Sequence, residues 1–115
     1  MEKHEFISGF ILELRRGTLI LCVLAKLRAP TYGYSLIPAL AESGITIEAN
    51  TLYPLLRRLE SQKLLASEWS TEGPKPRKYY RTTDFGEEVL AELVRHWQST
   101  VNSVEAVVKE SNHGT

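Results

Sequence analysis

The sequence contains a single cysteine and has no net charge, and both features limit what the protein can be. With Cys22 as the only thiol, no disulfide can form within the chain, and the cysteine–histidine spacing of a zinc site is missing. Cys22 lies in an apolar run, where a thiol usually serves as a small buried side chain. Lys and Arg together number 14, as do Asp and Glu, and a zero total argues against a nucleic-acid partner.

Long apolar runs are also absent. The longest unbroken one, residues 19–25, is far shorter than the roughly 20 residues that span a bilayer. The first ten residues include acidic side chains and are not followed by the apolar core and cleavage site of a secretory signal. The 115 residues, 43% of them hydrophobic, suit one globular domain. We therefore expect a cytoplasmic protein with no membrane partner.

Catalytic motifs are missing as well. His4, His96 and His113 have neither a nearby nucleophile in a glycine-rich turn nor a second histidine at ligand spacing. Glycine-rich phosphate-binding sequences do not occur. The sequence thus predicts no enzyme, no catalytic residue, no metal site and no cofactor.

The apolar residues that are present repeat mainly with helical spacing. Two short segments flanking a polar loop with one glycine and two prolines predict a hairpin instead. The expected elements are helices over residues 7–28, about 33–43 and from Asn50 or Thr51 onward, strands over 64–69 and 77–82, and a final helix over 84–110.

Local residues refine these boundaries. Pro38 predicts a kink or a late start in the second helix, because proline removes a backbone donor. Asn50 or Thr51 is expected as the N-cap of the third helix. Asp84 is expected as the N-cap of the last helix, with Glu87 three residues on.

The order of three helices, a hairpin and a long helix predicts a mostly α (α+β) fold. It is the winged helix-turn-helix plan with an added long C-terminal dimerisation helix. We expect a DNA-binding domain over residues 1–83, the dimerisation helix over 84–110 and a flexible tail over 111–115.

The third helix has an apolar face and a polar face. Leu52, Leu55, Leu56 and Leu59 follow the i, i+3, i+4, i+7 spacing of a core-facing stripe. In a helix-turn-helix domain the second helix of the pair enters the major groove, with its N-terminal end nearest the bases. The residues expected to contact DNA, from this helix, the preceding helix and the basic hairpin, are Tyr34, Asn50, Thr51, Tyr53, Pro54, Arg57, Arg58, Lys75, Arg77 and Lys78.

The distribution of charge supports this assignment better than its total does. Residues 57–81 hold seven basic and three acidic side chains, a net +4. Residues 84–110 hold six acidic and two basic side chains, a net −4. The zero total is therefore a cancellation between two surfaces.

The last helix carries an apolar seam. Its apolar residues step by four and three over nearly three heptads, which is typical of a coiled-coil contact. A second edge, formed by Phe85, Val89 and Leu93, can hold the helix to its own domain. Since the chain has no other helix of similar length as a partner, a second copy is the most economical one. The expected dimer-interface residues are Phe10, Leu90, Val94, Trp97, Val101, Val104 and Val108.

Each signal also has a plainer explanation. Arg57 and Arg58 could form a solvated helix face, and the basic hairpin could only keep an exposed strand edge soluble. The seam could be part of the chain's own core. Considered together, the order and spacing favour DNA binding, and the alternative is a winged-helix protein-interaction module without its own operator.

The sequence resembles the PadR family of bacterial transcriptional regulators, specifically its short members with one C-terminal helix. The combination of Thr51-Leu52-Tyr53-Pro54 with Pro76-Arg77-Lys78-Tyr79-Tyr80 is specific to it. The remaining residues that carry the resemblance lie within Leu14–Leu19, Tyr32–Ile37, Asn50–Glu60, Leu64–Leu65 and Gly73–Arg81.

The resemblance implies a homodimeric repressor that binds a near-palindromic double-stranded DNA operator. It implies that the last helix contacts the partner's first helix. Some short members bind flat aromatic compounds between tryptophans at the dimer interface. Trp97 stands at a seam position where it could bind such an effector or simply pack in the dimer core.

Overall fold

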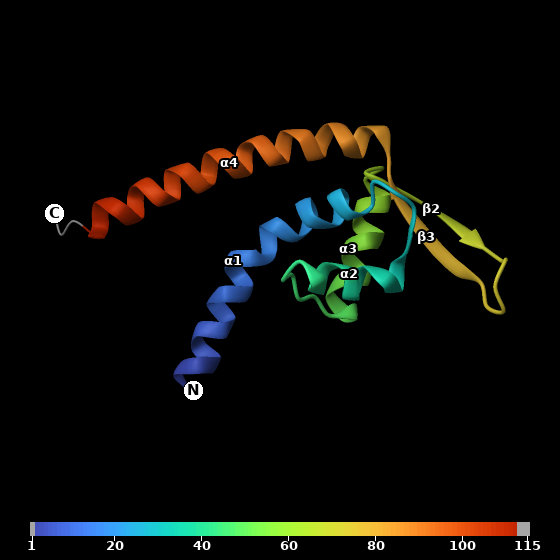
Figure 1. The fold of residues 1–115 in the computed structure, drawn as a ribbon, viewed down its shortest axis with the longest axis horizontal. Helices are drawn as coiled ribbons and strands as arrows, with labels where there is room; N and C mark the ends of the chain where they lie inside the picture. Colours follow the sequence, from blue (N-terminus) through green and yellow to red (C-terminus); the bar gives the residue numbers. More distant parts are fainter. Residues whose placement is uncertain (1, 113–115) are drawn as a thin grey trace.

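Helices dominate the structure, a computed structural model that describes residues 2–112 (Figure 1). This part of the chain confirms the predicted mostly helical α+β fold, a winged helix-turn-helix followed by a long C-terminal helix. Its elements are α1 (Lys3–Lys26), β1 (Thr31–Tyr32), a 3-10 helix η1 (Gly33–Ser35), α2 (Leu36–Glu42), α3 (Ala49–Ser61), β2 (Leu65–Ser70), β3 (Arg77–Thr82) and α4 (Asp84–Asn112).

The core lies where the C-terminal half of α1, the helices α2 and α3, the sheet and the root of α4 meet. Leu52, Leu56 and Leu59 of α3 are fully buried there, and Leu55 is partly buried. The predicted apolar stripe is therefore confirmed. Each of these leucines contributes about 2 kcal/mol through the apolar surface that it removes from water, so the opposite face of α3 can remain polar.

The sheet has three antiparallel strands in the order β1-β3-β2. The predicted hairpin is its β2–β3 pair, which we call the wing together with its connecting loop. The third strand, β1, was not predicted, because its two residues are too few to show a period of two. Tyr32 of β1 pairs with Tyr79 of β3, while Tyr80 is buried on the other face. This confirms that the two tyrosines of β3 point in opposite directions.

The first two helices differ from the prediction at their ends. Helix α1 begins at Lys3 instead of residue 7 and ends at Lys26 instead of residue 28. Helix α2 begins at Leu36, after the turn η1, so Pro38 is its third residue. At that position the helix needs no N–H donor. The late start predicted from Pro38 is confirmed.

The expected N-cap of α3 is wrong. The helix begins at Ala49, with Glu48 as the residue before it, because the N–H groups of Thr51 and Leu52 donate to the Glu48 carbonyl at 3.0 and 2.9 Å. Asn50 and Thr51 are therefore helical residues of the first turn. Their side chains are exposed on the surface of α3.

The expected N-cap of α4 is also wrong by one residue. Oγ1 of Thr83 accepts a hydrogen bond from the Gly86 N–H at 2.9 Å and donates one to the Lys63 carbonyl at 2.7 Å. Thr83 thus caps α4 and fastens it to the turn after α3. Asp84 is the first helical residue, where a carboxylate interacts favourably with the helix dipole.

Helix α4 is 29 residues long and runs past its predicted end. It includes residues 111 and 112, which were assigned to the tail, and the rest of that tail, residues 113–115, lies outside the described residues. Val89 and Leu93 pack against the core as expected, whereas Phe85 is exposed. The edge that holds α4 to its own domain therefore lacks Phe85.

Leu90 requires a correction. It was expected at the dimer interface, but its side chain is fully buried among the chain's own core residues. The first turns of α4 therefore belong to the same packed unit as the helix-turn-helix, and no surface of Leu90 remains for a partner.

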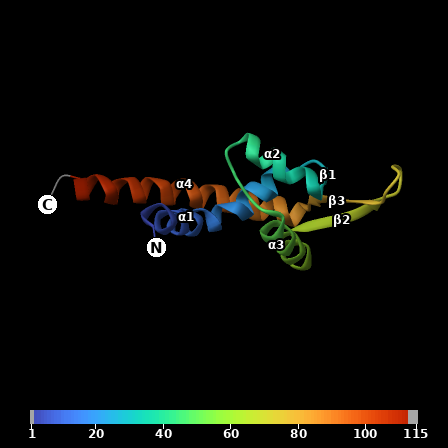
Figure 2. The same cartoon turned by 90° about the horizontal axis from the view of Figure 1, so that it is seen from below.

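Two stretches of helix extend beyond the core, and we call them the helical arms: residues 3–15 of α1 and 94–110 of α4. In Figure 1 they separate from one another as they leave the core, and Figure 2 shows α4 continuing to the far end of the molecule. The arms give the chain principal extents of 62 × 37 × 23 Å.

Candidate nucleic-acid interface

The exposed face of α3 carries most of the predicted DNA-contacting side chains. Asn50, Thr51, Pro54, Arg57 and Arg58 are all exposed, as the burial of the leucine stripe on the other face requires. Asn50 and Thr51 lie in the first turn, the end of a recognition helix that comes nearest the bases. The two arginines follow further along the helix, where guanidinium groups can reach phosphate oxygens or guanine edges.

A cluster of tyrosines connects α3 to the sheet. Tyr34 of η1 lies between Tyr32 and Tyr53, with ring centroids 6.2 Å and 6.4 Å away. Tyr32 also approaches Tyr79 of β3 at 6.0 Å. Tyr34 is 59% exposed, so it presents its ring and hydroxyl beside α3. Tyr32 and Tyr79 were not predicted as site residues, because their proximity depends on the unpredicted strand β1.

Burial raises the pKa of Tyr53, and the neighbouring hydroxyls of Tyr32, Tyr34 and Tyr80 raise it further. Its hydroxyl therefore stays protonated around neutral pH and can donate a hydrogen bond to a phosphate or a base. A neutral phenol also adds no negative charge to this surface.

Gly33 allows this cluster to form. A Cβ at this buried position would lie 3.2 Å from Cε2 of Tyr80 and 3.7 Å from Cε1 of Tyr53. The absence of a side chain lets η1 approach both rings closely. The tyrosine after it is thereby placed next to the recognition helix.

The wing presents its basic side chains in two different states. Lys75 and Arg77 are exposed, and the guanidinium of Arg77 lies 4.9 Å above the centre of the Tyr32 ring. Lys78 is only partly exposed, because its Nζ lies 3.5 Å from Oε1 of Glu60 on α3. Three wing residues are predicted to contact DNA. Within residues 2–112, Lys75 and Arg77 form no ion pair, whereas Lys78 is paired with Glu60.

A hollow of about 300 Å³ lies between the wing, η1 and α3. Its lining joins Tyr53 of α3 to Lys78 and Trp69 of the wing. The structure therefore brings α3, the tyrosine cluster and the wing together on one continuous surface.

The predicted dimer residues lie away from this surface. Along the helical arms, Phe10, Val94, Trp97, Val104 and Val108 are exposed, and Val101 is partly exposed. Further exposed apolar side chains on the arm of α1 are Phe6, Ile7, Ile11, Leu12 and Leu14. Exposed apolar side chains in this number are typical of a surface that contacts another molecule.

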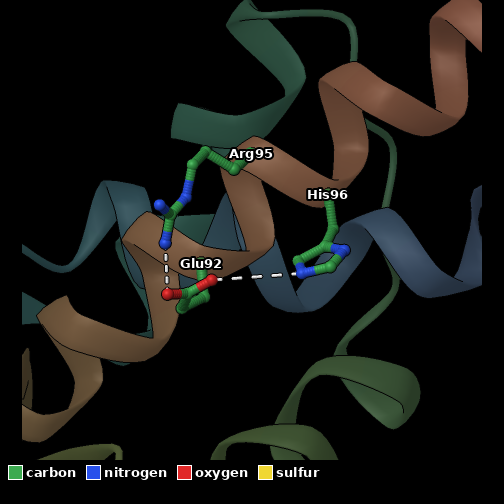
Figure 3. Close-up of polar contacts among 3 residues, drawn as sticks. All are labelled: Glu92, Arg95 and His96. Atoms are coloured by element: carbon green, nitrogen blue, oxygen red, sulfur yellow. Dashed lines mark hydrogen bonds and ion pairs between the residues drawn. The ribbon is translucent and has the colours of Figure 1, made fainter.

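Polar residues flank the apolar stripe of α4. Figure 3 shows Glu92 between Arg95, which donates a hydrogen bond to its carboxylate, and His96, whose Nε2 lies 3.9 Å from Oε2. These three side chains are exposed and form a solvated ridge. Within residues 2–112 no cluster of three His, Cys, Asp or Glu side chains could hold a metal ion. No helix of the described part is long and apolar enough to cross a membrane.

Residues 20–92 match the model of the transcriptional regulator PadR-like family. This segment runs from the second half of α1 to the buried root of α4 and contains the whole surface described above. The chain belongs to the PadR-like family. It is accordingly a DNA-binding transcriptional regulator and not an enzyme.

Individual PadR-like relatives agree with this assignment. The crystal structure of a PadR family transcriptional regulator from Eggerthella lenta is 57% identical, with a TM-score of 0.87, over 91% of this chain and 94% of that one. The transcriptional regulator Rv3488 of Mycobacterium tuberculosis is 38% identical over 61 residues, and an uncharacterised protein of Lysinibacillus sphaericus is 34% identical over 71 residues. These matches span 57% and 64%, respectively, of the two curated relatives.

Proposed function

We propose that this PadR-like regulator is a homodimeric repressor that binds a near-palindromic operator in the cytoplasm and is released by a small aromatic or phenolic ligand. The observation that carries the DNA-binding part is the continuous surface of α3, the tyrosine cluster and the wing. It combines exposed hydrogen-bonding groups at the start of a recognition helix with exposed cations on α3 and the wing.

The proposed contacts divide into two kinds. Asn50, Thr51 and Tyr34 lie where base edges or nearby phosphates would be met, and Tyr53 and Pro54 line the same side of the helix. Arg57, Arg58, Lys75 and Arg77 supply positive charge for the DNA backbone, and Lys78 lies beside them on the wing in an ion pair with Glu60. Helix α3 would lie in the major groove, with the wing against the adjacent backbone.

Dimerisation is supported by the exposed apolar side chains of the helical arms. Pairing would bury Phe10, Val94, Trp97, Val101, Val104 and Val108, and it would give the operator the symmetry of the protein. Half-sites would then be separated by about 34–36 Å or a multiple of it. In this arrangement residues 3–83 with the root of α4 bind DNA, and the rest of α4 joins the two copies.

The effector is proposed to bind near Trp97, an aromatic side chain that is 43% exposed on the arm of α4. A flat aromatic ligand stacked on the indole would change the angle between the arms of the two copies, and with it the spacing of the two α3 helices. Loss of the required spacing would release the operator.

Electrophoretic mobility shifts with the protein's own promoter test the DNA contacts. We expect binding to be sensitive to salt and to be weakened in the double variant Arg57→Ala, Lys75→Ala. Each phosphate contact that is lost lowers the number of counterions released on binding. Binding that survives both substitutions and shows no salt dependence would contradict the docking. A correctly folded dimer without DNA affinity, together with a stable protein partner that co-purifies, would favour the protein-interaction module.

Tryptophan fluorescence tests the effector site. Replacing Trp69 of the wing by Phe leaves Trp97 as the only tryptophan, and titration with planar phenolic compounds should then quench its emission. The matched variant Trp97→Phe, with Trp69 retained, should show no such quenching. A ligand that releases the operator without changing the emission of Trp97 would place the effector elsewhere.

A further inference from the structure

Lys78 differs from Lys75 and Arg77 of the wing because it forms an ion pair, and its partner is Glu60 of α3. The Nζ of Lys78 lies 3.5 Å from Oε1 of Glu60 and 5.3 Å from the centre of the Tyr80 ring. The side chains of Lys78 and Glu60 are 31% and 33% exposed. The pair is thus partly shielded from water, where an ion pair is weakened less by salt than at an open surface.

Glu60 has a second partner on the other strand of the wing. Oγ of Ser67 donates a hydrogen bond to Oε2 of Glu60. Ser67 lies on β2, opposite Tyr80 of β3, so one carboxylate contacts both strands of the hairpin. Glu60 is the second-to-last residue of α3. It therefore fastens the last turn of the recognition helix to the wing.

We propose that Glu60 is a positioning residue that fixes the wing against α3 and withholds Lys78 from DNA phosphates, which limits sequence-independent binding. The proposal rests on the DNA-binding function and assigns Lys78 a different part in it from that of Lys75 and Arg77. A phosphate and the Glu60 carboxylate compete for the same ammonium group. While Lys78 is paired with Glu60, the wing has one fewer positive charge available to bind a phosphate.

The test is the salt dependence of binding to a duplex of random sequence, measured by fluorescence anisotropy with the full chain. Glu60→Gln keeps the length of the side chain and an acceptor for Ser67, but it frees Lys78. We expect several-fold tighter binding at low salt. The slope of log K against log salt concentration should steepen by about 0.9, the value for one additional phosphate contact.

Glu68→Gln is the matched control. It removes the same charge from the wing residue that directly follows Ser67, and Glu68 makes no ion pair within residues 2–112. Ser67 and Glu68 are consecutive in β2, so Glu68 lies on the face of the sheet turned away from Glu60. This control should leave the slope nearly unchanged.

Substitution of Lys78 provides an independent test that does not alter Glu60. Lys78→Gln alone should not reduce the slope, whereas Lys75→Gln should reduce it by about 0.9. In the Lys78→Gln background, Glu60→Gln should no longer steepen it.

Three results would overturn the proposal: equal slopes for Glu60→Gln and Glu68→Gln, an effect of Glu60→Gln that persists without Lys78, or a loss of slope in Lys78→Gln as large as in Lys75→Gln. Thermal unfolding of each variant establishes that the protein is folded. If the unmodified protein shows no salt-dependent binding at all, the proposed DNA-binding function itself is wrong, and the role of Glu60 is wrong with it.

Discussion

The surface formed by α3 and the wing contrasts with the helical arms in what its side chains leave exposed. On α3 and the wing the exposed groups are mainly charged or hydrogen-bonding, and the leucines beneath them are fully buried. On the arms, phenylalanine, isoleucine, valine and tryptophan side chains remain in water. Exposed cations are well solvated without a ligand, whereas exposed apolar side chains are stabilised only when another surface covers them.

This contrast means that the two regions depend differently on their partners. The helix-turn-helix has a complete core within one chain, so DNA adds contacts to a structure that already exists. In the proposed dimer, the arms would gain much of their stability only on pairing. The effects of substitution should therefore be largest on the arms, and four predictions follow this order.

Val101→Glu should have the largest effect. A carboxylate placed in the proposed seam would lose its hydration on pairing, at a cost on the order of 3 kcal/mol or more, so the dimer should dissociate or unfold. Light scattering measures the mass, and circular dichroism measures the helix content. Ser99→Glu introduces the same charge on the opposite side of α4 and should leave the dimer intact. An unchanged mass and stability in Val101→Glu would remove the argument from the seam.

Gly86→Ala should come next and acts at the junction between the two regions. A Cβ at this position would lie 2.3 Å from the Leu64 carbonyl oxygen and 2.6 Å from Cγ2 of Thr82. We expect the free energy of unfolding to fall by about 3 kcal/mol, as for overpacking of a rigid contact. Gly17→Ala in α1 has nothing within 4 Å of its Cβ. That control should stabilise the helix by up to about 1 kcal/mol, and a similar loss in both variants would mean that the contact at Gly86 does not matter.

Removal of one positive charge should distinguish the two regions in DNA binding. Arg57→Gln should weaken binding by about 1–2 kcal/mol and reduce the salt slope by about 0.9, because α3 loses a phosphate contact. Arg95→Gln removes the same charge from the polar ridge of α4, and it should leave the slope unchanged. Mobility shifts over a salt series measure both. Equal losses would show that the total charge, and not its position, drives binding.

Alkylation of Cys22 should show the smallest effect. Burial raises the pKa of its thiol, so the folded protein favours the neutral form and contains little of the reactive thiolate below the usual pKa range. Iodoacetamide should therefore modify Cys22 slowly near pH 8 and much faster in denaturant. The free energy of unfolding should fall as the pH rises through the elevated pKa, because the folded state then has to bury a charged thiolate. Equal alkylation rates with and without denaturant would indicate an accessible thiol.

The sequence was sufficient where a pattern extends over several turns. The leucine stripe of α3, the alternation of Tyr79 and Tyr80 and the long helix α4 all follow from periodic burial. It was insufficient where a single hydrogen bond determines the residue at which a helix begins. The starts of α3 and α4 depend on the Glu48 carbonyl and the Thr83 hydroxyl. Cap propensity ranks Asn50 above Glu48 and Asp84 no lower than Thr83, so it favours the wrong residue in both helices.

Tertiary neighbours account for the remaining differences. Leu90 fits the heptad seam as well as Val94 does, and only the packing of the root of α4 shows that it belongs to the core. The tyrosine cluster depends on a two-residue strand that has no detectable period. The Glu60–Lys78 pair joins residues 18 positions apart in the sequence, and its formation depends on how the wing is inclined toward α3.

The cap at Thr83 has a mechanical consequence. A single residue separates β3 from α4, and its hydroxyl and backbone bind the turn that ends α3. A helix of 29 residues rises about 43 Å, so a tilt of about 5° at its root moves its far end by roughly 4 Å. Helix α4 is therefore fixed at its root to the turn after α3, and in the proposed dimer a rotation of its distant end would be transmitted to α3.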